Sequence, residues 1–200
     1  MHSAAPALTL SQVLWPAKDT DAARWMRAAI LVSLGVVAMA IAAKVRIPMW
    51  PVPITMQTLV VLTVGAAYGA GLGMVTMLAY LAVGALGFDI FTSSSAENNG
   101  LAYMMGGSGG YLVGFVLAAG VLGWLARKGW DRSIPMMALA MLIGSALIYI
   151  PGLMWLNMQP YAQGWSWTIA NGLTPFLIGD ALKLALAALV MPALWTLYKK

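Results

Sequence analysis

Long apolar runs separated by short polar stretches dominate the chain. Six runs occur, at about residues 25–43, 54–68, 71–87, 109–126, 134–156 and 175–197. A helix of roughly 17–25 apolar residues crosses the hydrocarbon core of a bilayer, and tilt or local thinning accommodates shorter ones. The pattern predicts an all-α membrane protein, a compact bundle of six transmembrane helices within residues 25–200. Residues 1–24 are mixed and partly polar, and are expected to form a cytoplasmic or interfacial tail.

The stretches between the runs carry turn signals. Residues 48–53 hold three prolines and are not expected to form regular helix. Residues 88–108 form a long polar stretch, and residues 157–171 form another outer loop. Thr174 and Pro175 have the types preferred at the N-cap and first position of a helix, so they predict the start of the last helix.

Lysine and arginine predict the orientation, because cytoplasmic loops are enriched in them. They gather in three places that fall on one side of a six-span bundle: Lys18, Arg24 and Arg27; Arg127, Lys128 and Arg132; Lys199 and Lys200. Both termini are therefore expected to be cytoplasmic. Lys44 and Arg46 fall on the outer side, where they either snorkel from a helix end or form a positive entrance for an anion.

Composition restricts the class of protein and its chemistry. The chain is 62% hydrophobic and 8% charged, which no soluble fold of this length accommodates. It has no cysteine, and its one histidine is His2 in the tail. Neither a metal site nor another cofactor is expected. The net charge of +5 does not indicate nucleic acid, because the basic residues cluster at the segment ends.

Two charged residues lie inside the last apolar run. Asp180 and Lys183 are three residues apart and share one helix face. An ionised side chain at bilayer depth costs on the order of 2.5–3.5 kcal/mol even on the lenient insertion scale. The pair is therefore either a self-neutralising packing clamp or part of a polar ligand site, one to two helical turns below the outer surface.

Other polar and aromatic residues predicted near the outer side complete a candidate site. The candidate ligand-binding residues are Gln57, Asn98, Asn99, Tyr103, Tyr111, Asp180, Lys183 and Arg46. They suit a small, partly apolar molecule that carries an amide-like or ureido group and an anion. Tryptophans 50, 155, 165 and 167 either wall this pocket or form a membrane-interface belt.

A hydrolase is the competing class. Residues 106–110 read GGSGG and match the Gly-x-Ser-x-Gly pattern, so a Ser108–Lys183 dyad is conceivable. A glycine-rich run satisfies this pattern by chance, and no histidine outside the tail can serve as base. The chain is not expected to be an enzyme.

Three stretches resemble the BioY family, the biotin-specific substrate-binding (S) components of energy-coupling-factor transporters. They are residues 52–59 (VPITMQTL), 99–115 (NGLAYMMGGSGGYLVGF) and 179–183 (GDALK). Together they extend over nearly the whole chain after the first two dozen residues. One departure is Gly107-Ser108, where family members more often have Pro-Thr, and it is expected to adjust the loop and not the ligand.

The resemblance implies a six-helix protein of the cell membrane that captures biotin from outside, with Asp180 and Lys183 in contact with it. It also implies a transmembrane coupling protein and a pair of ABC-type ATPases, although whether this chain needs them stays open. The small residues Ala29, Ser33, Ala38 and Ala42 of the first run either dock the coupling protein or pack within the bundle. An S component for another vitamin and a purely structural membrane subunit are the remaining alternatives.

Overall fold

The computed structural model describes residues 8–17, 20–95 and 98–198. The helices are α1 (Leu10–Leu14), α2 (Asp21–Lys44), α3 (Gln57–Tyr68), α4 (Ala70–Ala85), α5 (Gly100–Met105), α6 (Gly109–Ala126), α7 (Ile134–Asn157), α8 (Trp165–Gly172) and α9 (Leu177–Tyr198). Short 3-10 turns, η1 (Trp130–Arg132) and η2 (Thr174–Phe176), precede α7 and α9. The strands β1 (Arg46–Ile47) and β2 (Ile54–Thr55) form an antiparallel hairpin.

Each predicted apolar run contains a helix, so the prediction of a mainly helical membrane protein is confirmed. Among the described residues, four helical stretches are long and apolar enough to cross a bilayer: α2, α6, α7 and the stretch Trp165–Tyr198, which holds α8 and α9. Helices α3 and α4 are apolar but shorter, with 12 and 16 residues. Six membrane crossings and cytoplasmic termini stay predictions.

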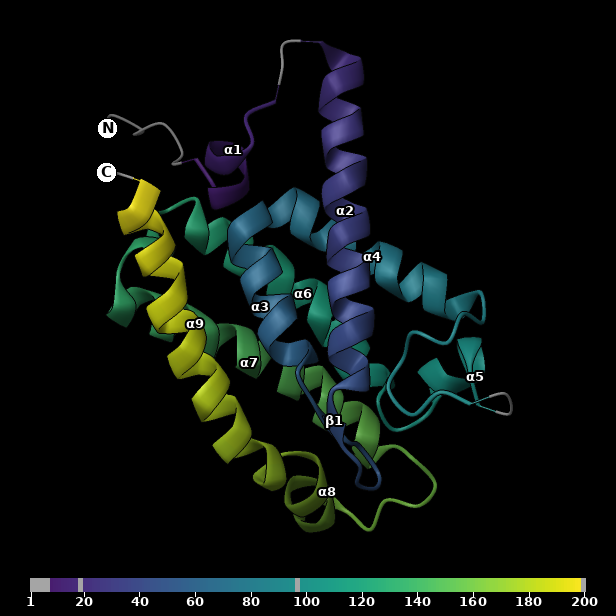
Figure 1. Cartoon of the computed structure of the whole chain (residues 1–200). Coiled ribbons are helices and arrows are strands. Elements are labelled where there is room, and N and C mark those ends of the chain that lie inside the picture. Colours follow the sequence, from purple (N-terminus) through teal and green to yellow (C-terminus); the bar gives the residue numbers. More distant parts are fainter. Residues whose placement is uncertain (1–7, 18–19, 96–97, 199–200) are drawn as a thin grey trace, which may run out of the picture.

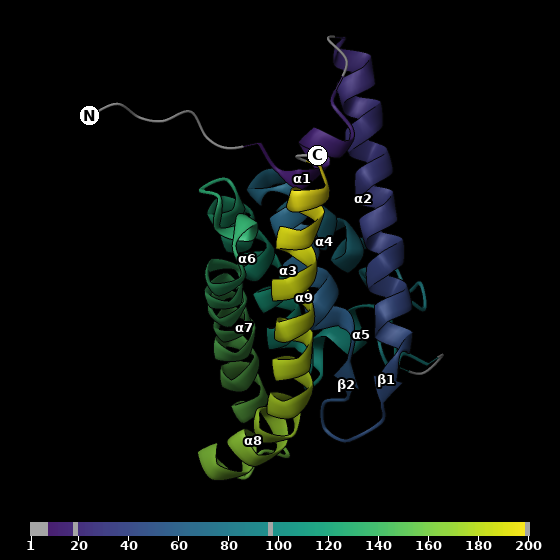
Figure 2. The same ribbon diagram turned by 60° about the vertical axis from the view of Figure 1, so that its left-hand side comes forward.

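Helix α6 forms the centre of the bundle, and α3, α4 and α7 pack against it. Helix α2 packs on α4 and α3, while α9 packs on α7 and α3 (Figure 1). Helix α1 and the C-terminal part of α9 lie at one end of the bundle, whereas α8 and the β1–β2 hairpin lie at the other (Figure 2). The two ends are called the α1 end and the hairpin end below.

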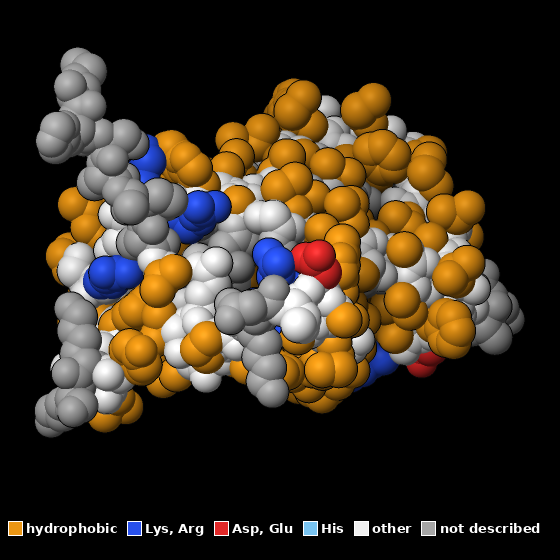
Figure 3. Space-filling view, turned by 90° about the horizontal axis from the view of Figure 1, so that it is seen from above, with side chains coloured by type: hydrophobic (Ala, Val, Ile, Leu, Met, Phe, Trp, Pro, Cys, Tyr) orange, Lys and Arg blue, Asp and Glu red, His pale blue; other side chains and the backbone are white. Residues whose placement is uncertain are grey.

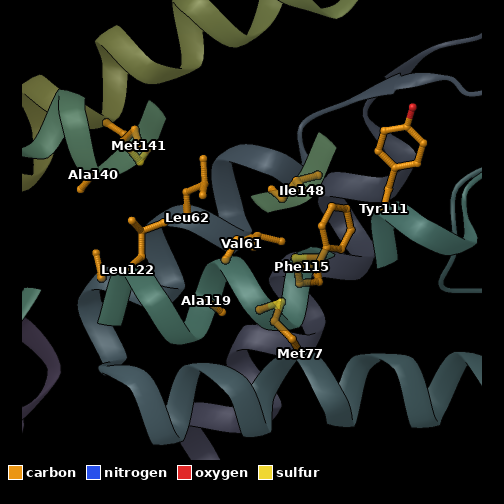
Figure 4. Packing of buried hydrophobic residues seen from close by; sticks show 14 of the residues in the cluster. Val61, Leu62, Met77, Tyr111, Phe115, Ala119, Leu122, Ala140, Met141 and Ile148 are labelled. Atoms are coloured by element: carbon orange, nitrogen blue, oxygen red, sulfur yellow. The ribbon is translucent and has the colours of Figure 1, made fainter. Parts of the chain in front are cut away.

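The core is built by apolar side chains of α3, α4, α6 and α7 that face one another (Figure 4). Two glycines of α6 let α7 approach closely. A Cβ atom on Gly110 would lie 2.2 Å from the carbonyl oxygen of Pro151, and one on Gly114 would lie 2.6 Å from Cα of Ile148. Small residues at such contacts are typical of helix packing in membranes, where backbones gain van der Waals contact by close approach.

The outer surface of the bundle is apolar as well. Leu34 of α2, Leu142 of α7 and Leu189 of α9 are each more than half exposed, with exposed fractions of 56%, 56% and 57%. Single exposed apolar residues are ordinary, but apolar side chains over most of a helix surface are expected only where lipid or a partner covers them.

The expected helix cap at Thr174 is wrong, and the hairpin and the short helices α1, α5 and α8 were not anticipated from the sequence. Thr174 does not cap a helix: it lies inside η2, and its hydroxyl donates to the carbonyl of Ile169 at 3.1 Å. The proline-rich stretch leads through a hairpin, and the polar and loop stretches contain the short helices α5 and α8. Within the tail, α1 packs on α3. The predictions that concern His2, Lys18, Lys199 and Lys200 lie outside the described residues.

Candidate functional site

The two charged residues of α9 form an ion pair. Lys183 Nζ lies 2.9 Å from Asp180 Oδ1, and the two side chains are only 9% and 14% exposed. Asp180 lies in the first turn of α9, closer to the helix start than expected. The i, i+3 spacing brings both heads together on one face of the helix.

Two hydroxyl groups from other helices complete the polar contacts of this pair. The Thr58 hydroxyl, from the first turn of α3, accepts from Lys183 at 3.0 Å and donates to Asp180 Oδ1 at 3.2 Å. The Tyr149 hydroxyl of α7 donates to Asp180 Oδ2. These bonds join α3, α7 and α9, and they offset part of the cost of burying the two charges.

A cavity with an empty volume of about 490 Å³, including its opening, lies beside this cluster. Lys183, Thr58 and Tyr149 line it, whereas Asp180 lies behind them and is not among its lining residues. The cavity walls come from the hairpin, α3, the loop after α4, α5, α6, α7, η2 and α9. Apolar and aromatic side chains provide much of the lining, and polar groups are interspersed: Val52, Pro53, Leu112, Phe115, Ile148, Phe176, Tyr103, Tyr111, Tyr149, Thr55, Gln57, Thr58, Thr92, Ser108 and Lys183. An apolar enclosure with a few convergent polar groups is typical of small-molecule sites.

Three further residues predicted for the site line this cavity. The Gln57 amide nitrogen donates to the Tyr80 hydroxyl at 2.9 Å, which fixes the side chain between α3 and α4. The Tyr111 hydroxyl donates to the carbonyl of Gly172 at 2.8 Å, so it ties α6 to the end of α8. Tyr103 of α5 is buried and stacks on Phe91 with ring centroids 4.8 Å apart.

The other three predicted residues are not brought into the cavity. Asn98 is exposed and its backbone pairs with Ser95, while Asn99 precedes α5. The Arg46 guanidinium is exposed and donates to the Ser93 hydroxyl. It lines a separate, mainly apolar groove of about 750 Å³ between the hairpin and α9, which shares Lys183 with the cavity.

The sequence did not predict that Thr58, Tyr149 and Thr92 line the cavity. Thr58 follows Gln57 directly, and Tyr149 is a hydroxyl-bearing residue within an apolar run, so both carried a weak polar signal. Thr92 lies in the loop after α4, and its buried hydroxyl has no hydrogen-bond partner among the described residues. No sequence pattern distinguishes such a threonine from its neighbours.

Three aromatic rings gather at the hairpin end. Trp50 of the hairpin loop lies 5.1 Å from Tyr161 and 5.7 Å from Trp167 of α8, measured between ring centroids. A Cβ atom on Gly107 would lie 2.6 Å from the Tyr161 hydroxyl oxygen, so this glycine leaves room for the cluster. The cluster joins the hairpin loop to α8 and to the loop that precedes α8.

Ser108 lines the cavity together with Lys183, but the lysine is hydrogen-bonded to other residues. Its ammonium group forms the ion pair with Asp180 and donates to the Thr58 hydroxyl. A general base for a serine nucleophile must be uncharged and within hydrogen-bond reach of it. The geometry therefore disfavours the serine hydrolase alternative.

Comparison with known proteins identifies relatives along most of the chain. The profile of the BioY family matches residues 12–200. A probable biotin transporter BioY of Pyrococcus horikoshii is 32% identical over 160 residues, which cover 80% of this chain and 91% of the relative. The biotin transporter BioY of Thermotoga maritima is 32% identical over 165 residues, 82% of this chain and 94% of the relative.

A solved structure has the same fold. It is described as the S-component for biotin from an ECF-type ABC transporter, and it superimposes with a TM-score of 0.75. The match covers 90% of this chain and 95% of the other, at 22% sequence identity. The relatives are named as transporters and not as enzymes. The extent of the profile match and the identity to these relatives establish that the chain belongs to the BioY family.

Proposed function

We propose that this protein is the S component of a biotin uptake system and binds biotin in the cavity beside Asp180 and Lys183. One observation carries the proposal: Lys183, which forms a buried ion pair with Asp180, lines an otherwise largely apolar cavity. A buried ion pair alone is weak support for stability, so the position of Lys183 in the wall of a largely apolar cavity favours a binding role. Membership of the BioY family agrees with biotin as the ligand.

The groups around the cavity match the chemistry of biotin. A ureido ring offers two N–H donors and a carbonyl acceptor. The carboxylate of Asp180 accepts N–H groups in charge-assisted bonds, and Lys183 keeps one ammonium N–H beyond its two donations. Phe115, Ile148 and Phe176 provide apolar contacts for the sulfur ring and the aliphatic chain.

In the proposed arrangement all six main helices cross the cell membrane, and the hairpin end faces outward. The α1 end carries Arg27, Arg127, Lys128 and Arg132, which agrees with a cytoplasmic position. The ring cluster of Trp50, Tyr161 and Trp167 then lies on the outer side next to the cavity. Biotin enters from outside and is released inward when a coupling protein and an ATPase pair act on the bundle.

Helix α2 offers the contact surface for the coupling protein. Ala29 and Ser33 are exposed on it, and Leu34 beside them is more than half exposed. Ala42 is instead buried against the bundle, and Ala38 is half-buried. The spacing of Ala29 and Ser33 thus suits docking, and that of Ala38 and Ala42 suits packing within the chain.

The test is isothermal titration of the detergent-purified protein with biotin, thiamine and riboflavin. Biotin alone is expected to bind, at one molecule per chain. Asp180→Asn is expected to weaken binding about ten-fold or more, because charge-assisted hydrogen bonds contribute about 1.5–3 kcal/mol. Asp89→Asn makes the same chemical change in an exposed loop and serves as the matched control.

Unchanged biotin affinity in a folded Asp180→Asn protein would remove Asp180 from the site. Selective binding of thiamine or riboflavin would mean that the chain is an S component for that vitamin and not for biotin. Absence of binding to all three compounds, in a sample with a cooperative unfolding transition, would leave the ion pair as a packing clamp.

A further inference from the structure

A second cavity lies at the α1 end of the bundle, away from the biotin site. It holds about 650 Å³ of open space including its mouth. The walls come from α1, α2, the α3–α4 turn and the end of α6, and the polar side chains among them are Thr9, Ser11, Gln12, Tyr68, Arg27 and Arg127. Figure 3 views this end and shows Lys and Arg side chains set among apolar ones. The biotin cavity, by contrast, is mainly apolar.

The two arginines bring positive charge that no carboxylate among the described residues pairs with. Arg27 donates through Nε to the carbonyl of Trp15 at 2.5 Å and through Nη2 to that of Ser11 at 2.6 Å. These uncharged carbonyls fix the guanidinium in place through two of its five N–H groups. Within residues 8–17, 20–95 and 98–198, the ion pairs are Asp21–Arg24, Lys44–Asp89 and Asp180–Lys183, and none includes Arg27 or Arg127.

The start of α4 adds to this positive field. The 16-residue helix begins at Ala70 directly after Gly69, and no side chain caps its first turn. Gly69, Ala70 and Gly71 all line the cavity, and a Cβ atom on Gly71 would meet nothing within 4 Å. The unpaired N–H groups of a first turn favour an anion in front of them.

We propose that this cavity binds the phosphate group of an anion, supplied by an anionic phospholipid headgroup or by free phosphate. Guanidinium groups hold phosphate oxygens in paired hydrogen bonds, which a fixed Arg27 and an adjacent Arg127 can provide. Trp25 and Met26, which directly precede Arg27 on α2, are exposed apolar residues, with exposed fractions of 77% and 60%. A headgroup in the cavity thus leaves its acyl chains against an apolar helix surface.

The experiment is native mass spectrometry of the full chain with phosphatidylglycerol and phosphatidylcholine of identical acyl chains. Phosphatidylglycerol is expected to be retained preferentially. Arg127→Gln should reduce its retention about five-fold, since one basic residue near an anionic surface contributes about that factor. Lys128→Gln is the matched control: it removes the neighbouring charge, which lies over the Trp124 ring at 3.6 Å and does not line the cavity.

A second arm titrates inorganic phosphate. Phosphate binding that is lost in Arg127→Gln and kept in Lys128→Gln, without any lipid preference, supports the same site with a soluble anion. Equal effects of the two substitutions, or binding of neither probe, would overturn the proposal. Biotin titration of Arg127→Gln separates this site from the proposed function, because Arg127 lies at the other end of the bundle and biotin affinity should stay unchanged.

Discussion

Two ion pairs of this protein are alike in length and opposite in setting. Lys44 Nζ lies 2.7 Å from Asp89 Oδ1 at the hairpin end, and Lys183 Nζ lies 2.9 Å from Asp180 Oδ1 inside the bundle. The first pair has side chains 43% and 68% exposed, whereas those of the second are 9% and 14% exposed. Water stabilises the separated charges of the first pair, but hardly reaches those of the second.

Burial and hydrogen bonding, and not contact distance, determine how much an ion pair contributes to the stability of the fold. The exposed pair joins the end of α2 to the loop after α4, where Lys44 also donates to the Phe91 carbonyl at 3.0 Å. The buried pair joins three helices through Thr58 and Tyr149, and its Lys183 lines the cavity in which we propose that biotin binds. Each member of the buried pair depends on the other, and the exposed charges do not share this dependence.

Removing one member of the buried pair should lower the free energy of unfolding more than any other change proposed below. Lys183→Met leaves the Asp180 carboxylate without its cation, and breaking a buried pair in this way costs about 3–5 kcal/mol of unfolding free energy. The measurement is reversible unfolding in mixed micelles, by titration with dodecyl sulfate. Lys44→Met, the same substitution in the exposed pair, should cost less than about 1 kcal/mol.

The double variant Asp180→Asn/Lys183→Met tests the reason for that loss. It removes both charges, so much of the stability lost in Lys183→Met should return, while biotin binding stays weak. Equal losses in the Lys183→Met and Lys44→Met variants would show that burial does not distinguish the two pairs.

The hydroxyl of Tyr149 should have the next largest effect. Tyr149→Phe keeps the ring and removes the bond to Asp180, and bonds to charged groups contribute about 1.5–3 kcal/mol. Tyr111→Phe is the control, since its hydroxyl donates to the uncharged carbonyl of Gly172 and should contribute about 0.5–1.5 kcal/mol. Thermal unfolding of the two variants measures the difference, and a larger loss in Tyr111→Phe would contradict this account.

The helices could be predicted because a helix that faces lipid is apolar along its whole length, and such a run is visible in the sequence. The prolines of residues 48–53 excluded helix, but the hairpin was missed because two-residue strands leave no alternating pattern. Helix α8 was missed because its eight residues mix polar and aromatic types. Thr174 has the residue type of an N-cap, yet the 3-10 turn η2 places it one turn before α9.

Residues of the candidate site could be predicted where a polar or charged side chain interrupts an apolar run or belongs to a family motif. Asp180 and Lys183 stand out as charges in an apolar run, and Gln57 and Tyr111 belong to the quoted motifs. Tyr149 and Thr92 come into the site only through the packing of α7 and the course of the loop after α4. Conversely, Asn98 has suitable amide chemistry, but its loop holds it outside the cavity.

Thr92 offers a smaller change that separates binding from stability. Its buried hydroxyl is unpartnered within the described part of the chain, so Thr92→Val should raise the unfolding free energy of the ligand-free protein by about 1 kcal/mol. The same variant should bind biotin about five-fold more weakly, the equivalent of one neutral hydrogen bond. Calorimetry and titration measure the two effects.

Thr76→Val is the control for Thr92, because the buried Thr76 hydroxyl already donates to the Leu72 carbonyl at 2.8 Å and lies outside the cavity. It should not stabilise the protein and should leave biotin affinity unchanged. A Thr92→Val variant that behaves like Thr76→Val would remove Thr92 from the site.

The smallest contribution to the free energy of unfolding is expected from the exposed Lys44–Asp89 pair. Its dependence on pH can be measured. Hydrogen bonds from Lys44 and Ser94 hold the pKa of Asp89 below its ordinary value. The carboxylate therefore stabilises the fold above the ordinary aspartate pKa of about 3.9, and this contribution is lost as pH falls through the lower pKa of the folded state. The difference in unfolding free energy between wild type and Asp89→Asn should be small at neutral pH, shrink with added salt, and vanish in acid. A difference that persists in acid and resists salt would mean that this pair behaves like the buried one, and that exposure is not what separates them.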